Sequence, residues 1–173
     1  MNAGPVRRAC TLAFVALGAA GCALPDTSAT VVATCPSRAS FTAVSPFLVD
    51  GCGTTDCHGQ PSRPLRIMGY SGLRLDPSDV PGGNPTTVAE VDANWESVCG
   101  LQPELMTEVE AGQAPAGELL LLMKPLGETN HKGGTVIVPG DDGDACLTSW
   151  LGKNFNQGDD AACARASVAQ LQP

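Results

Sequence analysis

Two cysteines and a histidine share one short segment, Cys52-Gly53-Thr54-Thr55-Asp56-Cys57-His58. Two thiols followed directly by an imidazole are the groups that covalent haem attachment needs. The thiols add to the two vinyl groups of the porphyrin, and the next residue offers a ring nitrogen to the iron. Two more residues separate the cysteines than in the usual C-x-x-C-H spacing. The segment predicts thioether links at Cys52 and Cys57 and iron ligation by His58.

The same segment has other interpretations. Cysteines that lie close together in an exported chain often form a disulfide, so a Cys52–Cys57 bond is the main alternative. A zinc site would need a fourth ligand and a better tetrahedral spacing. No G-x-S-x-G turn or paired acid motif accompanies the serines and carboxylates, so the chain is not predicted to be an enzyme.

An electron-transferring haem iron takes a second axial ligand, which is most often histidine or methionine. The chain has only two histidines, and His131 follows His58 on a glycine-rich segment, Asn130-His131-Lys132-Gly133-Gly134. We rank His131 first as the distal ligand. Met123 is the alternative, although a methionine beside four leucines is typical of a core-filling residue.

Cationic side chains near these segments have two possible roles. Arg63, Arg66 and Arg74 follow the cysteine loop, and Lys132 follows His131. Arginine forks pair well with carboxylates, so one of these side chains could hold a haem propionate. Solvent exposure is the other interpretation.

The N-terminus has the pattern of an export signal. Arg7 and Arg8 precede a short apolar run that ends in Gly18-Ala19-Ala20-Gly21-Cys22, which resembles a bacterial lipobox. This pattern predicts cleavage before Cys22 and acylation of that residue. The expected organisation is a signal segment (1–21), a tether (22–36) and one domain (37–173), anchored by lipid at the cell envelope and facing the periplasm or the outside.

Cysteine usage agrees with export, because six cysteines follow Cys22. If Cys52 and Cys57 hold haem, four remain, and four cysteines allow three connectivities. We favour Cys146–Cys163, which would close a short loop between two helices. The second pair would then be Cys35–Cys99.

Apolar spacing, caps and breakers predict a mostly α domain with long loops. Residues 65–68, 73–75 and 135–138 are candidates for brief extended segments. The first expected helix is capped by Ser37, ends near Gly51 and is kinked or split at Pro46. The next two run from Thr86 or Thr87 to Val98 and from Glu104 to Ala111, the latter with Pro103 in its first turn. The last three are a helix from Glu118 to Lys124, a helix that is capped by Asp144 and contains Trp150, and a helix from Asp159 to Leu171.

The charge balance narrows the class of partner. The formal net charge is −8, and removal of Arg7 and Arg8 with the signal segment would change it to −10. Such acidity argues against binding to nucleic acid or to anionic headgroups. It would suit a partner with a basic face.

From Phe41 to Gly152 the order of features resembles the c-type cytochrome domains of bacterial periplasmic and surface lipoproteins. Those features are a helix, a Cys…Cys-His-Gly loop, a leucine-rich turn that ends at Pro125, the His131 segment and a helix that ends in Trp150-Leu151-Gly152. The resemblance implies a small cytochrome c-like fold, one covalent haem c, and electron transfer with a periplasmic or membrane redox partner. The alternative function is a haem-free, disulfide-stapled lipoprotein that serves as an interaction or structural module.

Overall fold

The computed structural model describes residues 33–153 and 155–170. The predicted signal segment, the lipidation site Cys22 and residues 22–32 of the predicted tether therefore lie outside the described residues. Within the described part, no helix is both long enough and apolar enough to cross a membrane.

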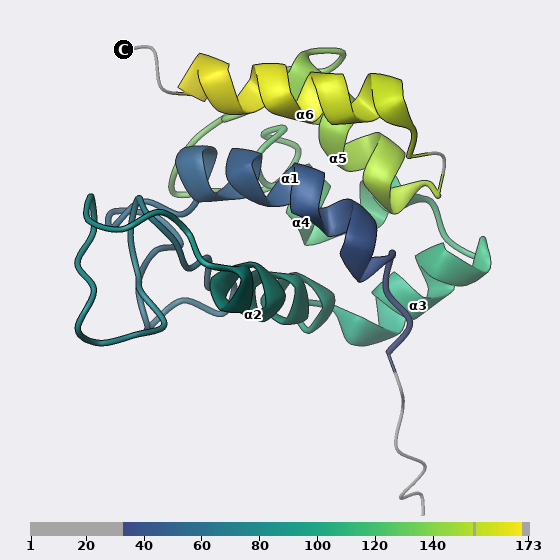
Figure 1. Cartoon of the computed structure of the whole chain (residues 1–173). Helices are drawn as coiled ribbons and strands as arrows, with labels where there is room; N and C mark the ends of the chain where they lie inside the picture. The colour runs from purple at the N-terminus through teal and green to yellow at the C-terminus, as the bar shows by residue number, and fades with distance from the viewer. Residues whose placement is uncertain (1–32, 154, 171–173) are drawn as a thin grey trace, which may run out of the picture. The chain divides into compact units, whose positions relative to one another are not determined.

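Six α-helices and one short 3-10 helix, joined by long loops, make up the described domain (Figure 1). The prediction of a mostly helical chain is confirmed. Residues 135–138 form no strand, and the described residues contain a single isolated β-bridge, between Met68 and Leu73. The elements are α1 (Arg38–Gly51), α2 (Val88–Cys99), α3 (Pro103–Ala111), η1 (Ala116–Glu118), α4 (Leu120–Met123), α5 (Asp142–Leu151) and α6 (Gln157–Gln170).

Local signals set the ends of the first three helices. The Ser37 side chain accepts a hydrogen bond from the N–H of Ala39 at the start of α1. A capping box between Thr87 and Glu90 begins α2. Pro103 occupies the first turn of α3, and Gly112 ends it at a φ of 73°, a conformation that favours glycine. These features are close to the predicted boundaries because each depends on neighbouring residues.

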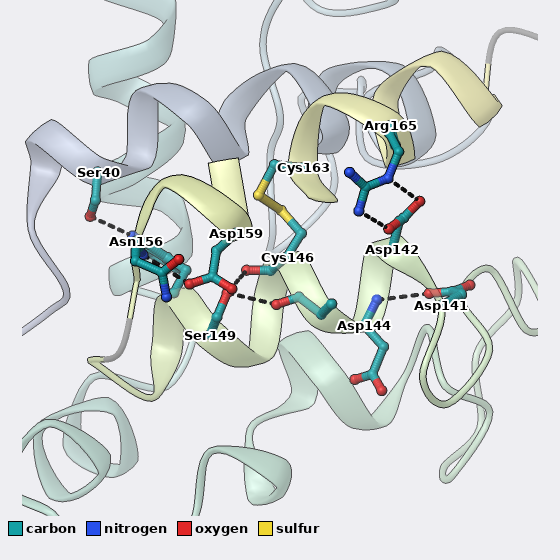
Figure 2. The surroundings of a disulfide bond; sticks show 12 residues. Ser40, Asp141, Asp142, Asp144, Cys146, Ser149, Asn156, Asp159, Cys163 and Arg165 are labelled. Carbon is teal, nitrogen blue, oxygen red and sulfur yellow. Dashed lines mark hydrogen bonds and ion pairs between the residues drawn. A yellow bond between two sulfur atoms is a disulfide. The ribbon is translucent and has the colours of Figure 1, made fainter. Parts of the chain in front are cut away.

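Two helices differ from the prediction. The segment expected as one helix from Glu118 to Lys124 is divided between η1 (Ala116–Glu118) and α4 (Leu120–Met123), with Leu119 extended between them. Asp144 does not cap α5: the N-cap is Asp141, whose carboxylate accepts the N–H of Asp144 (Figure 2).

Of the two alternatives predicted for Pro46, a split does not occur, because α1 continues through that residue. The buried face of α1 on both sides of Pro46 packs into the core, and this packing offsets the backbone hydrogen bond that proline removes.

Helix α1 is at the centre of the core, with α6 alongside it and α5 packed against both (Figure 1). Phe41 of α1 and Trp150 of α5 are both fully buried, and their ring centroids lie 5.1 Å apart. The indole N–H of Trp150 donates to the Ser40 hydroxyl at 3.1 Å. The aromatic contact fixes the register of α5 on α1 near the first turns of α1.

The α5–α6 hairpin is fastened at two places (Figure 2). A buried disulfide joins Cys146 of α5 to Cys163 of α6. Farther along α6, Arg165 forms two hydrogen bonds with the carboxylate of Asp142. The disulfide closes a loop of short sequence separation, as expected from the sequence.

The packed domain begins before residue 37. Cys35 forms a disulfide with Cys99 at the end of α2, and the indole N–H of Trp95 donates to the carbonyl of Pro36 at 2.9 Å. The last residues of the predicted tether are thus held against α2, since the second disulfide lies on the tether side of the predicted boundary.

The long loop from residue 59 to residue 87 is ordered by a buried guanidinium. The Arg74 side chain donates to both carboxylate oxygens of Glu90, at 2.8 and 3.2 Å. It also donates to the backbone carbonyls of Asn84 and Pro85. These bonds tie two distant parts of the loop to the first turn of α2.

Candidate functional site

The cysteine loop begins directly at the end of α1. Cys52 is the C-cap of the helix, and its N–H bonds to the carbonyls of Leu48 and Val49. The loop then turns back, because the N–H of His58 donates to the carbonyl of Cys52 at 2.9 Å. The two additional residues of the C-x4-C-H spacing are accommodated in this turn, so His58 returns to the residue from which the loop starts.

Side chains hold this turn from outside. Arg63 donates from Nε to the carbonyl of Cys57 at 2.9 Å, and the Gln60 amide donates to the carbonyl of Thr55. Both bonds satisfy carbonyls that the tight turn leaves without partners of its own. Cys57 and His58 are therefore anchored from two directions.

His58 has the hydrogen bonding of an imidazole prepared for a metal. Its Nδ1 lies 3.0 Å from the carbonyl oxygen of Leu65. A carbonyl oxygen only accepts hydrogen bonds, so Nδ1 carries the proton and Nε2 keeps its lone pair in the neutral ring. Burial lowers the pKa of His58. The hydrogen bond to Leu65 opposes this effect, but the neighbouring His131 and cations add to it, so the pKa lies below its usual value. The ring is thus neutral near pH 7, as a metal ligand must be.

His131 has the same arrangement at the other end of the site. Its Nδ1 lies 2.8 Å from the carbonyl oxygen of Gly134, which again leaves Nε2 available. The segment that carries it is closed at its base, since the N–H groups of Val136 and Ile137 both donate to the carbonyl of Pro125. Gly134 adopts a φ of 71°, which places its carbonyl for this contact.

The chain's two histidines meet across one space. Their ring centroids are 6.2 Å apart, and the ring planes are inclined by only 17°. They are separated by 73 residues in the sequence and reach each other because the loop after α1 and the loop after α4 end on the same side of the core.

Both rings border a cavity of about 330 Å³. Most of its lining residues are apolar, among them leucines from α1, α4 and α5, and the described lining contains no carboxylate. The lining consists of Phe47, Leu48, Cys52, His58, Arg63, Pro64, Leu65, Leu101, Leu120, Leu121, Lys124, Pro125, Asn130, His131, Lys132 and Leu147. The cavity can hold an apolar group that carries negative charge only toward the cationic part of its wall.

The structure brings together most of the residues singled out from the sequence. Cys52, His58 and His131 line the cavity, and Cys57 precedes His58 in the anchored turn. Met123 is partly buried but is not part of the lining. Met123, the predicted alternative to His131, therefore does not line the cavity.

The four cations predicted as carboxylate partners separate into different roles. Arg63 and Lys132 line the cavity. Arg74 does not, because it is committed to Glu90 in the long loop, and Arg66 is exposed beside the lining residue Leu65. Lys124 joins the lining although the sequence analysis did not select it. The sequence feature that could have identified Lys124 is its position in a leucine-rich helical turn.

The thiols of Cys52 and Cys57 are both free. Burial, reinforced by the neighbouring Cys57, raises the pKa of Cys52 to about 12. The thiol therefore stays protonated near neutral pH, as an S–H group and not a thiolate. In the described part of the chain, no group of three or more His, Cys, Asp or Glu side chains is placed to hold a metal ion.

Gly53, Gly59 and Gly72 allow three backbone segments near His58 to approach one another closely. A Cβ atom on Gly59 would lie 2.1 Å from the carbonyl oxygen of Gly53, and one on Gly72 would lie 2.0 Å from the same atom. Both distances are far below van der Waals contact. The atom that the Cβ would meet belongs to the backbone, which cannot move aside as the end of a flexible side chain can. The close approach requires glycine at these positions.

We expect Gly59→Ala to lower the free energy of unfolding by about 1–3 kcal/mol, the usual cost of overpacking a tight site. Gly117→Ala is the matched control, because nothing lies within 4 Å of a Cβ at that position. Urea denaturation of the two variants measures the difference. Equal stabilities would mean that the backbone contact at Gly59 is not as close as described.

Comparisons with family models, with curated proteins and with solved structures found no match to this chain.

Proposed function

We propose that the cavity holds one covalently attached haem and that the protein transfers single electrons. The observation that carries the proposal is the pair of nearly parallel histidine rings, 6.2 Å apart, on one cavity. In each ring, Nδ1 is bound to a backbone carbonyl, so each can present Nε2 to an iron between them.

The separation of the rings suits a metal held by both. Metal–imidazole bonds are about 2 Å long, so two of them in line account for about 4 Å. The remainder of the centroid distance is close to the sum of the two ring radii. Two imidazoles in direct stacking contact would lie closer than this, and two unrelated surface histidines would have no reason to share an orientation.

The wall of the cavity also fits a porphyrin. Leu48, Leu121 and Leu147 come from three different helices and offer an apolar surface to a flat ring. Two of the three lining cations, Arg63, Lys124 and Lys132, could neutralise its propionates. Free thiols at Cys52 and Cys57 can each add S–H across a vinyl group, forming a C–S bond and transferring the hydrogen to the adjacent carbon without any oxidant.

The haem would supply one-electron redox chemistry to the site. The protein's residues would hold the iron with His58 and His131, fix both ring orientations through Leu65 and Gly134, and exclude water with leucines. Two histidine ligands leave no open iron position, so catalysis at the iron is not proposed. A cytochrome c-like fold is part of the same proposal.

The cellular setting follows from the sequence alone. Cleavage before Cys22 and acylation of that residue would anchor the domain at the cell envelope, facing the periplasm or the outside. A periplasmic or membrane redox partner would then exchange electrons with it.

Haem attachment is tested by expressing the full chain in a host with a haem-ligation system. We expect a red protein with a Soret band, haem that stays with the polypeptide on a denaturing gel, and a mass increased by one haem. The Cys52→Ala/Cys57→Ala double variant should lose the haem on the gel, whereas the Cys146→Ala/Cys163→Ala variant should keep it.

A colourless protein whose mass spectrum shows a Cys52–Cys57 disulfide would reject the proposal. That result would support the alternative function, a disulfide-stapled interaction or structural module.

A further inference from the structure

Only some of the cationic side chains of this acidic protein form ion pairs. The chain has ten lysines and arginines, of which Arg7 and Arg8 lie outside the described residues. Ion pairs with carboxylates engage Arg38, Arg74, Lys153 and Arg165. The remaining described cations form no ion pair, and they are Arg63, Arg66, Lys124 and Lys132.

Three of these four unpaired cations, Arg63, Lys124 and Lys132, line the cavity. Arg66 is exposed next to the lining residue Leu65. No aspartate or glutamate belongs to the described lining. The hydrogen bonds that Arg63 and Lys124 do make go to backbone carbonyls, which leaves their charge uncompensated. The mouth of the cavity is therefore a positive patch on a protein of net charge −8.

The charge near the cavity mouth, rather than the net charge of the protein, decides whether a charged partner is attracted to it. At physiological ionic strength the Debye length is about 8 Å, so carboxylates elsewhere on the surface are largely screened from the mouth. Two haem propionates would compensate at most two of the three lining cations, so positive charge would remain at the cavity.

We infer that the cavity mouth, defined by Arg63, Lys124 and Lys132, is the docking surface for a redox partner that presents a cluster of carboxylates. The inference rests on the electron-transfer function and adds the kind of partner. It is the opposite of the basic partner that net charge alone suggests. Electrostatic complementarity at this surface orients the partner and raises the association rate.

A pair of redox-inert paramagnetic probes tests the charge of the mouth on the full mature chain. We expect hexacyanochromate(III), an anion, to broaden the amide NMR signals of Arg63, Leu65 and residues 130–133. Hexaamminechromium(III), a cation of the same shape, should not broaden them. Lys132→Gln should weaken binding of the anion about fivefold, whereas Lys153→Gln, with the same change in net charge, should leave it unchanged.

The kinetic arm uses electron transfer itself. One electron passes from the reduced protein to hexacyanoferrate(III), which becomes hexacyanoferrate(II). We expect the second-order rate constant to fall as salt rises, because the attraction at the mouth is screened. A rate that rises with salt would show that the net negative charge governs the encounter, and it would overturn the docking surface.

The two proposals fail in different ways. A haem protein whose mouth repels the anionic probe, or binds both probes equally, overturns only the docking surface. A protein without haem overturns the electron-transfer function and, with it, the proposed partner.

Discussion

Replacing His131 with alanine will convert most of the ferric haem protein from a low-spin to a high-spin spectrum. The change removes one of the two strong-field nitrogen ligands that we propose for the iron and leaves only His58. His131 is the residue to test because its ring lies 6.2 Å from that of His58 on the same cavity. Absorption and electron paramagnetic resonance spectra of the purified variant measure the change.

Two further experiments distinguish the loss of an iron ligand from a general disruption of the fold. Added imidazole should enter the cavity of His131→Ala and restore the low-spin spectrum, which it could not do if the cavity had collapsed. Met123→Leu is the matched control, because Met123 does not line the cavity. We expect its spectrum to equal that of the wild type.

An unchanged low-spin spectrum in His131→Ala would exclude that residue as the distal ligand. If Met123→Leu then became high-spin, the alternative ligand considered from the sequence would be the correct one.

Replacing Arg74 with methionine will lower the free energy of unfolding by about 3–5 kcal/mol, the cost of leaving a buried charge without its partner. The Arg74 and Glu90 side chains are 2 % and 1 % exposed, so water cannot take the place of the guanidinium. The variant also loses the bonds to the Asn84 and Pro85 carbonyls. Urea denaturation at neutral pH measures the loss.

Arg165→Met supplies the control for this effect. Arg165 also forms a two-bond ion pair, with Asp142, but its side chain is 60 % exposed and that of Asp142 is 41 % exposed. Exposed pairs contribute about 0–1 kcal/mol. A loss of similar size in both variants would mean that burial does not make the Arg74 pair special.

Acid should remove the contribution of this pair in a defined window. Burial alone would raise the pKa of Glu90, but hydrogen bonds from Arg74 and from the N–H groups of Thr87 and Leu75 outweigh it and lower the pKa to about 2. A lowered pKa gives stability that is complete above about pH 4.5 and is lost as the pH falls toward 2. The stability difference between wild type and Glu90→Gln should therefore shrink as the pH falls through this range.

Helix boundaries were predicted well where the deciding groups are neighbours in the sequence. The cap at Ser37, the capping box at Thr87 and the stop at Gly112 each need only residues within one helical turn. The start of α5 was misplaced because Asp141 and Asp144 are both competent caps. Asp141 prevails because its second oxygen also accepts the N–H of Val138, a contact that depends on the preceding turn.

Residues 135–138 have the composition of a strand, yet the described part of the chain offers no neighbouring strand to pair with them. The N–H groups of Val136 and Ile137 donate instead to the single carbonyl of Pro125. Strand propensity is realised only when a partner backbone lies alongside, and local sequence does not report that.

Sequence alone determined which chemistry this protein could perform, because two thiols, two imidazoles and their order along the chain are properties of composition and spacing. Only the tertiary structure decided which of these groups meet. It placed His131 opposite His58 across 73 residues, assigned Arg74 to Glu90 rather than to the cavity, and left three unpaired cations at the cavity mouth. The physical reason is that caps and turns are settled by bonds within a few residues, whereas a cavity exists only where helices from distant parts of the chain pack against each other.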